Sequence, residues 1–77
     1  MKKLSRDDLS RLQAAVYKAI FKRPSTCDDV EEALGITHQS CSPRFGELDR
    51  RGLIAKTGEQ RLTRSGRPAW IWQARKS

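Results

Sequence analysis

The chain has 77 residues, with 16 Lys or Arg against 9 Asp or Glu, which gives a formal net charge of +7. A chain of this length makes one small domain and excludes a two-domain enzyme or a large cofactor cleft. Its apolar runs are far shorter than the ~20 residues of a membrane span, and no apolar segment follows the basic N-terminus as in a secretory signal. Two cysteines without a Cys-x-x-Cys pair favour a reduced, intracellular protein. The excess positive charge favours a polyanion as partner, with nucleic acid ahead of a membrane surface.

The first predicted helix covers about residues 6–22. Ser5 and Asp8 have the N-cap and N3 spacing of a capping box, and Leu4 and Leu9 are placed to form a hydrophobic staple around it. Apolar residues then recur every three or four positions, as on a helix with one buried face, until a proline ends the pattern.

A second, short helix is predicted over about residues 27–34. Thr26 and Asp29 repeat the capping-box spacing, and Gly35 is the expected C-terminal stop. A tight turn through Ile36 then leads into a further helical pattern.

This third helix is predicted over about residues 38–51, with Thr37 as its N-cap and a glycine directly after it. Cys41, Phe45 and Leu48 follow one another at intervals of four and three, so they are expected to face inward together.

Pro43 falls inside the third helix and breaks a local rule. It has no N–H to donate and should bend the first turn or make it irregular. A shorter helix with Ser42 as N-cap and Pro43 at the first helical position would be better local chemistry, but it discards half of the helix. We therefore predict the longer helix with a distorted start.

After the third helix the pattern changes to that of a β-hairpin over about residues 53–74. Residues 53–57 and 69–74 are rich in residues that favour strands. The polar segment 58–68 between them is expected to form the turn, with Ser65 and Gly66 at its tip.

Two segments carry a resemblance to a known family. Residues 26–54, TCDDVEEALGITHQSCSPRFGELDRRGLI, resemble the helix-turn-helix of bacterial MarR-type winged-helix regulators, and residues 58–72, GEQRLTRSGRPAWIW, resemble the wing of small phage-encoded winged-helix proteins. The resemblance implies an α+β fold: one winged helix-turn-helix domain over residues 1–77, with three helices followed by a β-hairpin wing. The larger regulators have extra dimerisation helices that this chain does not match, so their obligate dimer and ligand pocket are not carried over.

In such a fold the third helix is the recognition helix, which enters the major groove of DNA. The residues expected to face the DNA from this helix are Thr37, His38, Gln39, Ser40, Ser42 and Arg44. Gln39 can pair bidentately with adenine and Arg44 with guanine, while Thr37 and nearby N–H groups can hold a phosphate. The alternative is that these residues form an ordinary solvated surface.

The excess charge lies entirely in the C-terminal third of the chain. Residues 1–49 hold eight basic and eight acidic residues, whereas residues 50–77 hold eight basic residues against Glu59 alone. A wing laid along the DNA backbone or into the minor groove would have such a charge. The predicted contacts are Arg61, Arg64 and Arg67 in the wing, with Arg50, Arg51 and Lys56 as further phosphate contacts. The alternative is a basic loop kept for solubility.

Other kinds of site are not predicted. Cys27, His38 and Cys41 have the spacing of no zinc module and lack a fourth ligand, so no metal site and no cofactor are expected. The single histidine has no paired nucleophile, and we predict that the protein is not an enzyme. Trp70 and Trp72 should share one face of their strand, either covering the core or contacting a partner.

The predicted function is sequence-specific binding of double-stranded DNA by a small phage or bacterial transcription regulator, in the bacterial cytoplasm or an infected host cell. A palindromic target would require a homodimer. One alternative is a low-specificity DNA-binding accessory protein in replication or recombination. Another is a winged helix that binds a protein partner through the tryptophan strand or the first helix.

Overall fold

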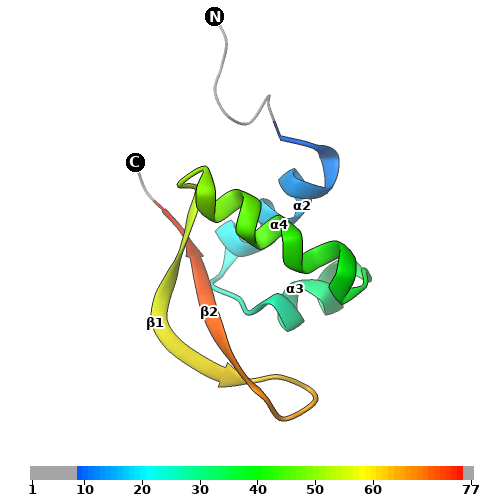
Figure 1. Cartoon of the computed structure of the whole chain (residues 1–77), viewed down its shortest axis with the longest axis vertical. Coiled ribbons are helices and arrows are strands. Elements are labelled where there is room, and N and C mark those ends of the chain that lie inside the picture. Colours follow the sequence, from blue (N-terminus) through cyan, green and yellow to red (C-terminus); the bar gives the residue numbers. More distant parts are fainter. Residues whose placement is uncertain (1–8, 76–77) are drawn as a thin grey trace, which may run out of the picture.

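A computed structural model describes residues 9–75 of the chain. In order along the chain, its elements are α2 (Arg11–Lys22), α3 (Cys27–Leu34), α4 (His38–Arg50), β1 (Ile54–Leu62) and β2 (Pro68–Ala74). The helices pack against one another, and the two strands form a hairpin that extends from one side of them (Figure 1). Within this part of the chain no helix is both long and apolar enough to cross a membrane.

Helix α2 begins later than the sequence predicted. Leu9 and Ser10 are not helical, so the expected continuous helix over 6–22 is wrong at these two positions. Ser10 is the N-cap: its hydroxyl accepts a hydrogen bond from the Gln13 N–H, and the Gln13 side chain accepts one from the Ser10 N–H. This second capping box satisfies two otherwise unpaired donors and fixes the start of the helix. The predicted cap at Ser5 and Asp8 lies outside the described residues.

The turn between α3 and α4 has the local chemistry that the sequence predicted. Thr26 and Asp29 form a reciprocal capping box at the start of α3. Gly35 ends α3 in the left-handed conformation, with φ of 68°, which glycine adopts without the steric cost of a Cβ. Thr37 then caps α4 by accepting a hydrogen bond from the Ser40 N–H.

Helix α4 includes Pro43 and has the longer of the two predicted extents. It is α-helical without interruption from His38 to Arg50, so the proline does not displace its start, and the irregular start that was predicted is not found. The carbonyl of Gln39, four residues earlier, loses the N–H that another residue at position 43 would donate.

The hairpin has a longer first strand than predicted. Strands β1 and β2 pair antiparallel, with Ile54 opposite Ala74 at the base. Residues 58–62, expected to be part of the turn, continue β1 toward the tip.

A register irregularity lets the first strand continue. It lies between Lys56 and Gln60 and contains Gly58, whose φ is 96°. The remaining turn is closed by a hydrogen bond from the Thr63 N–H to the Arg67 carbonyl at 2.8 Å. Arg61 is therefore carried on paired strand backbone, and Arg64 lies in the turn between the two strands.

The core lies between the three helices and the base of the hairpin. Its buried residues are Val16, Ile20, Val30, Cys41, Phe45, Leu48 and Ile54. The three inward positions predicted for α4 are among them, which confirms that expectation. Trp72 covers this core, with its ring edge-on to Phe45 at a centroid distance of 5.8 Å. Its backbone also pairs with that of Ser25 through two hydrogen bonds, which ties β2 to the segment between α2 and α3.

Candidate nucleic-acid interface

The first half of α4 presents two unpaired polar side chains to solvent. Gln39 and Ser42 are exposed, and neither side chain has a partner in the described part of the chain. Thr37 and Ser40, in contrast, are used by the helix cap, where the Thr37 hydroxyl accepts from the Ser40 N–H and donates to the Ser40 hydroxyl, both at 3.2 Å. Of these four predicted contacts, Gln39 and Ser42 are the two free to meet a base edge.

Arg44 is held in an ion pair on its own helix. Its Nε and Nη2 each donate to one oxygen of Glu47 at 2.8 Å, and the Gln13 side chain from α2 donates to the same carboxylate at 2.6 Å. These hydrogen bonds, first from Arg44 and then from Gln13, lower the pKa of Glu47 and keep it charged. The guanidinium uses only one edge in this contact, and the five-donor group keeps further N–H bonds for a second acceptor.

His38 is directed toward α3 rather than standing free. Its Nδ1 lies 2.6 Å from Glu31 Oε2, although 70% of its side chain is exposed. The first side chain of the predicted recognition helix is therefore paired with the preceding helix.

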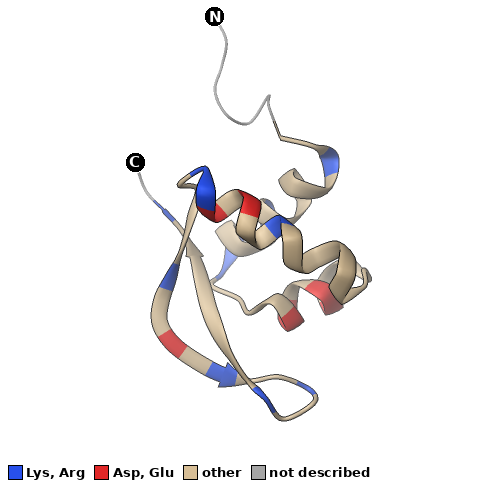
Figure 2. Cartoon of the chain, in the orientation of Figure 1, with Lys and Arg blue, Asp and Glu red and all other residues tan. Residues whose placement is uncertain are grey.

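Two of the three wing arginines contact carboxylates of α3. Arg61 pairs with Asp29, and Arg64 donates from Nε to Asp28 Oδ1 at 2.8 Å and from its backbone N–H to Oδ2 at 3.2 Å. In Figure 2, acidic positions of α3 lie on the side of the helices toward which the basic tip of the hairpin curves. The hydrogen bonds from Arg64 hold the pKa of Asp28 below its ordinary value. Part of the charge excess read from the sequence is thus neutralised within the molecule.

The remaining predicted basic contacts differ in their surroundings. The Arg67 side chain is exposed and has no partner among residues 9–75. Lys56 lies over both tryptophan rings of β2, with Nζ 5.0 Å from the centroid of Trp70 and 5.7 Å from that of Trp72. Both rings therefore share one face of the strand, as predicted. Arg50 and Arg51 are exposed at the end of α4.

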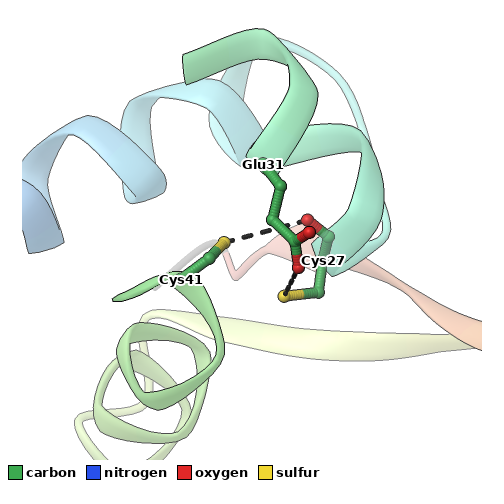
Figure 3. A group of neighbouring side chains, drawn as sticks. All are labelled: Cys27, Glu31 and Cys41. Atoms are coloured by element: carbon green, nitrogen blue, oxygen red, sulfur yellow. Dashed lines mark hydrogen bonds between the residues drawn. The ribbon is translucent and has the colours of Figure 1, made fainter. Parts of the chain in front are cut away.

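A separate polar cluster lies between α3 and α4. The thiols of Cys27 and Cys41 and the Glu31 carboxylate, drawn in Figure 3, have ligand atoms within 4.8 Å of one another. The Cys27 thiol donates to Glu31 Oε2 at 3.3 Å, and the Cys41 thiol donates to the Cys27 carbonyl at 3.8 Å. The neighbouring Cys41 thiol and burial together raise the pKa of Cys27. Sequence reasoning considered the two cysteines together with His38 but missed Glu31. The signal available was the paired spacing on consecutive helices, four residues from Cys27 to Glu31 and three from His38 to Cys41.

Sequence comparison identifies no relatives. No protein-family model matches the chain, and no curated protein shows significant sequence similarity to it. Solved structures do resemble it. A point mutant of ZitR from Lactococcus lactis has a TM-score of 0.72 at 18% identity, covering 99% of this chain and 49% of the ZitR chain. A second ZitR mutant gives 0.71 at 17% identity, covering 97% and 49%.

A possible transcriptional regulator from Methanosarcina mazei Go1 has a TM-score of 0.70 at 14% identity, covering 91% of this chain and 59% of its own. The present chain thus spans about half to three fifths of the length of these proteins. The similarity extends over the helices and the hairpin together. The chain has the winged helix-turn-helix fold that its sequence predicted.

Proposed function

We propose that the protein binds double-stranded DNA in a sequence-specific manner and acts as a transcription regulator of a bacterium or a phage. The observation that carries the proposal is the exposed first half of α4, which a winged-helix fold presents to the major groove. The described part of the chain leaves Gln39 and Ser42 there with unpaired hydrogen-bonding groups. Contact with DNA removes water from these groups, and a hydrogen bond to a base edge offsets the free energy lost by desolvation.

Arg44 is the proposed guanine contact, and its ion pair with Glu47 supports that role. The carboxylate engages the Nε and Nη2 edge, so the end of the guanidinium still offers two N–H groups to guanine O6 and N7. A side chain fixed in this way loses less rotamer entropy on binding than a free one. Gln39 is proposed to read adenine from the same face.

The wing is proposed to lie along the backbone or in the minor groove, with Arg67 as its direct contact. Arg61 and Arg64 can contact the DNA only by exchanging their ion pairs with carboxylates of α3 for ion pairs with phosphates. Arg50, Arg51 and Lys56 are proposed as further phosphate contacts, with Thr37 and the first N–H groups of α4 as another. His38 and Ser40, the remaining residues predicted to face the DNA, are proposed to contribute by fixing the geometry of the start of α4.

The test is selection of bound sites from a random pool of double-stranded DNA, followed by measurement of Kd for the selected and a scrambled site. We expect the selected site to bind at least about 1,000-fold more tightly. The Arg44→Ala variant should lower this ratio by about tenfold or more, because it removes one bidentate base contact. Lys18→Ala, which removes an exposed charge from α2, is the matched control and should leave the ratio unchanged.

The same measurement separates the alternatives. A ratio near one would favour the low-specificity accessory protein, and no binding at low salt would rule out both DNA-binding functions. Symmetric selected sites would indicate that two copies bind together. The protein-binding alternative has one supporting observation, since Trp70 is 39% exposed. Co-purification of another protein with this chain, in the absence of nucleic acid, would favour the protein-binding alternative.

A further inference from the structure

We propose that Cys27, Glu31, His38 and Cys41 form a Zn²⁺ site that joins α3 to α4. Cys27 and Glu31 lie one turn apart on α3, and His38 and Cys41 lie one turn apart on α4. Each pair therefore projects from one side of its helix toward the other pair. The sequence alone predicts no metal site, because it shows no fourth ligand beside the cysteines and the histidine. The fold supplies that ligand as Glu31.

The spacing of the ligand atoms is close to that of a tetrahedral ion. Zinc bonds of ~2.3 Å to sulfur and ~2.0–2.1 Å to nitrogen or oxygen place neighbouring ligand atoms about 3.3–3.8 Å apart. Cys27 Sγ lies 3.3 Å from Glu31 Oε2 and 4.0 Å from His38 Nδ1. Glu31 Oε2 and His38 Nδ1 are 2.6 Å apart, and Cys41 Sγ lies within 4.8 Å of the Cys27 and Glu31 atoms. Shifts of about 1 Å at Cys27, Glu31 and His38, which are not fully buried, would bring these three ligands closer to the expected spacing beside the buried Cys41.

The donor set selects the kind of ion. Two thiolates, one imidazole and one carboxylate suit Zn²⁺ and similar borderline-soft ions, whereas Mg²⁺ and Ca²⁺ require oxygen ligands. Figure 3 shows Cys27 and Glu31 on one helix facing Cys41 on the other. With two thiolates and a carboxylate, the ligands carry more negative charge than the ion neutralises, and Arg64, 3.6 Å from Glu31, offsets the difference.

The proposed site is buried on the side of Cys41 and Glu31 and open to solvent on the side of His38. Cys41 is fully buried in the core, and the Glu31 side chain is only 11% exposed. His38 lies at the surface and can close over an ion that has entered. A simple packing role accounts for Cys41. The largely buried Glu31 carboxylate, which His38 and Arg64 contact at 2.6 and 3.6 Å, adds an oxygen ligand beside the two thiols.

Binding at this site would fix the helix-turn-helix angle. The four ligands belong to the first turn and a half of α3 and the first turn of α4, on either side of the connecting turn. An ion held by both helices stabilises the folded chain in proportion to its affinity, because the unfolded chain does not hold the four ligands together.

The experiment uses the full chain without an affinity tag, treated with chelator and kept reduced. We expect it to bind one Zn²⁺ per chain with a submicromolar Kd by calorimetry. With Co²⁺ as the probe, thiolate-to-cobalt charge-transfer bands and intense tetrahedral d–d bands should appear. Zinc at a hundredfold excess over Kd should raise Tm by about 10–20 °C.

Two variants at partly exposed ligands test the assignment without emptying the core. Cys27→Ser and Glu31→Gln should each weaken Zn²⁺ binding by at least about tenfold. Glu32→Gln is the matched control, since Glu32 is the next residue of α3 and its side chain is 63% exposed. It should bind zinc like the parent, and circular dichroism of each variant checks that it is folded.

Three results would overturn the proposal. One is binding no tighter than micromolar by the parent chain. The second is an equal loss of affinity in the Glu32→Gln control. The third is ready oxidation to a Cys27–Cys41 disulfide by a reduced chain that takes up no zinc, which would assign the pair to redox chemistry instead.

Discussion

The Arg44–Glu47 pair illustrates how one side chain determines what another can do. A guanidinium that is free in solution must be ordered before it can make a bidentate contact, whereas this one is already oriented by two hydrogen bonds at 2.8 Å. Gln13 holds the carboxylate from a neighbouring helix. The orientation of the Arg44 side chain therefore depends on the packing of α2 against α4.

We predict that Glu47→Gln weakens binding to the preferred DNA site by about tenfold while the fold is retained. The amide offers one acceptor where the carboxylate offers two, so the side-on pairing with Arg44 is lost. Kd for the selected and scrambled sites is the measurement. Asp49→Asn removes a neighbouring exposed charge from α4 and is the control for a general charge effect. An equal change in both variants would contradict the orienting role of Glu47.

Pro43 also leads to a prediction at the scale of one residue. In the interior of α4 it removes a backbone hydrogen bond, a defect that costs up to ~3 kcal/mol relative to alanine. Its rigidity in the unfolded chain offsets some of this cost. Pro43→Ala should therefore raise the free energy of unfolding by about 2 kcal/mol in urea titration. Ser42→Ala, at the adjacent exposed position, should change it by no more than about 0.5 kcal/mol.

At the scale of elements, α3 and the hairpin are joined by charge. Asp28 and Asp29 suit the start of a helix, where the dipole favours acidic groups, and the same two residues hold Arg64 and Arg61. The acidic residues in the first turn of α3 therefore both stabilise the start of that helix and orient the wing.

The resulting pH dependence follows from the pKa of Asp28, which Arg64 lowers from 3.8. A carboxyl whose pKa is lower in the folded state adds stability above its unfolded pKa, and this stability is lost as the pH falls through the folded value. Asp28→Asn should be less stable than the parent at pH 7, and the difference should shrink below pH 3.8. Urea unfolding across that range measures it. Glu59→Gln, on the exposed outer part of β1, should show no such convergence.

The elements that could be predicted from sequence are those set by neighbouring residues. The caps at Thr26 and Thr37 and the stop at Gly35 each depend on residues within four positions. The start of α2 was missed because two capping boxes compete five residues apart, and periodicity alone does not rank them. The first strand was predicted too short because its continuation depends on pairing with β2 past Gly58.

The candidate site was predicted less well, since its contacts are long-range. Arg64 and Asp28 are separated by 36 positions, and they meet only because the hairpin bends toward α3. Glu31 likewise becomes a neighbour of Cys41 only after the turn sets the two helices side by side. Composition located the charge correctly in the last third of the chain, but it could not show which arginines are already paired.

At the scale of the whole molecule, this pairing determines how salt should act on DNA binding. Five or six phosphate contacts give a slope of about −5 in a plot of log affinity against log salt. The Arg67 side chain has no partner within residues 9–75, so Arg67→Ala should flatten the slope by about one unit for every DNA sequence. Arg64 is neutralised by Asp28, so Arg64→Ala should leave the slope nearly unchanged and lower Tm instead. Lys18→Ala controls for the loss of one charge. Equal flattening by both arginine variants would mean that Arg64 leaves Asp28 of α3 for a DNA phosphate on binding. In that case the paired and the unpaired arginines of the wing would contribute equally to DNA binding.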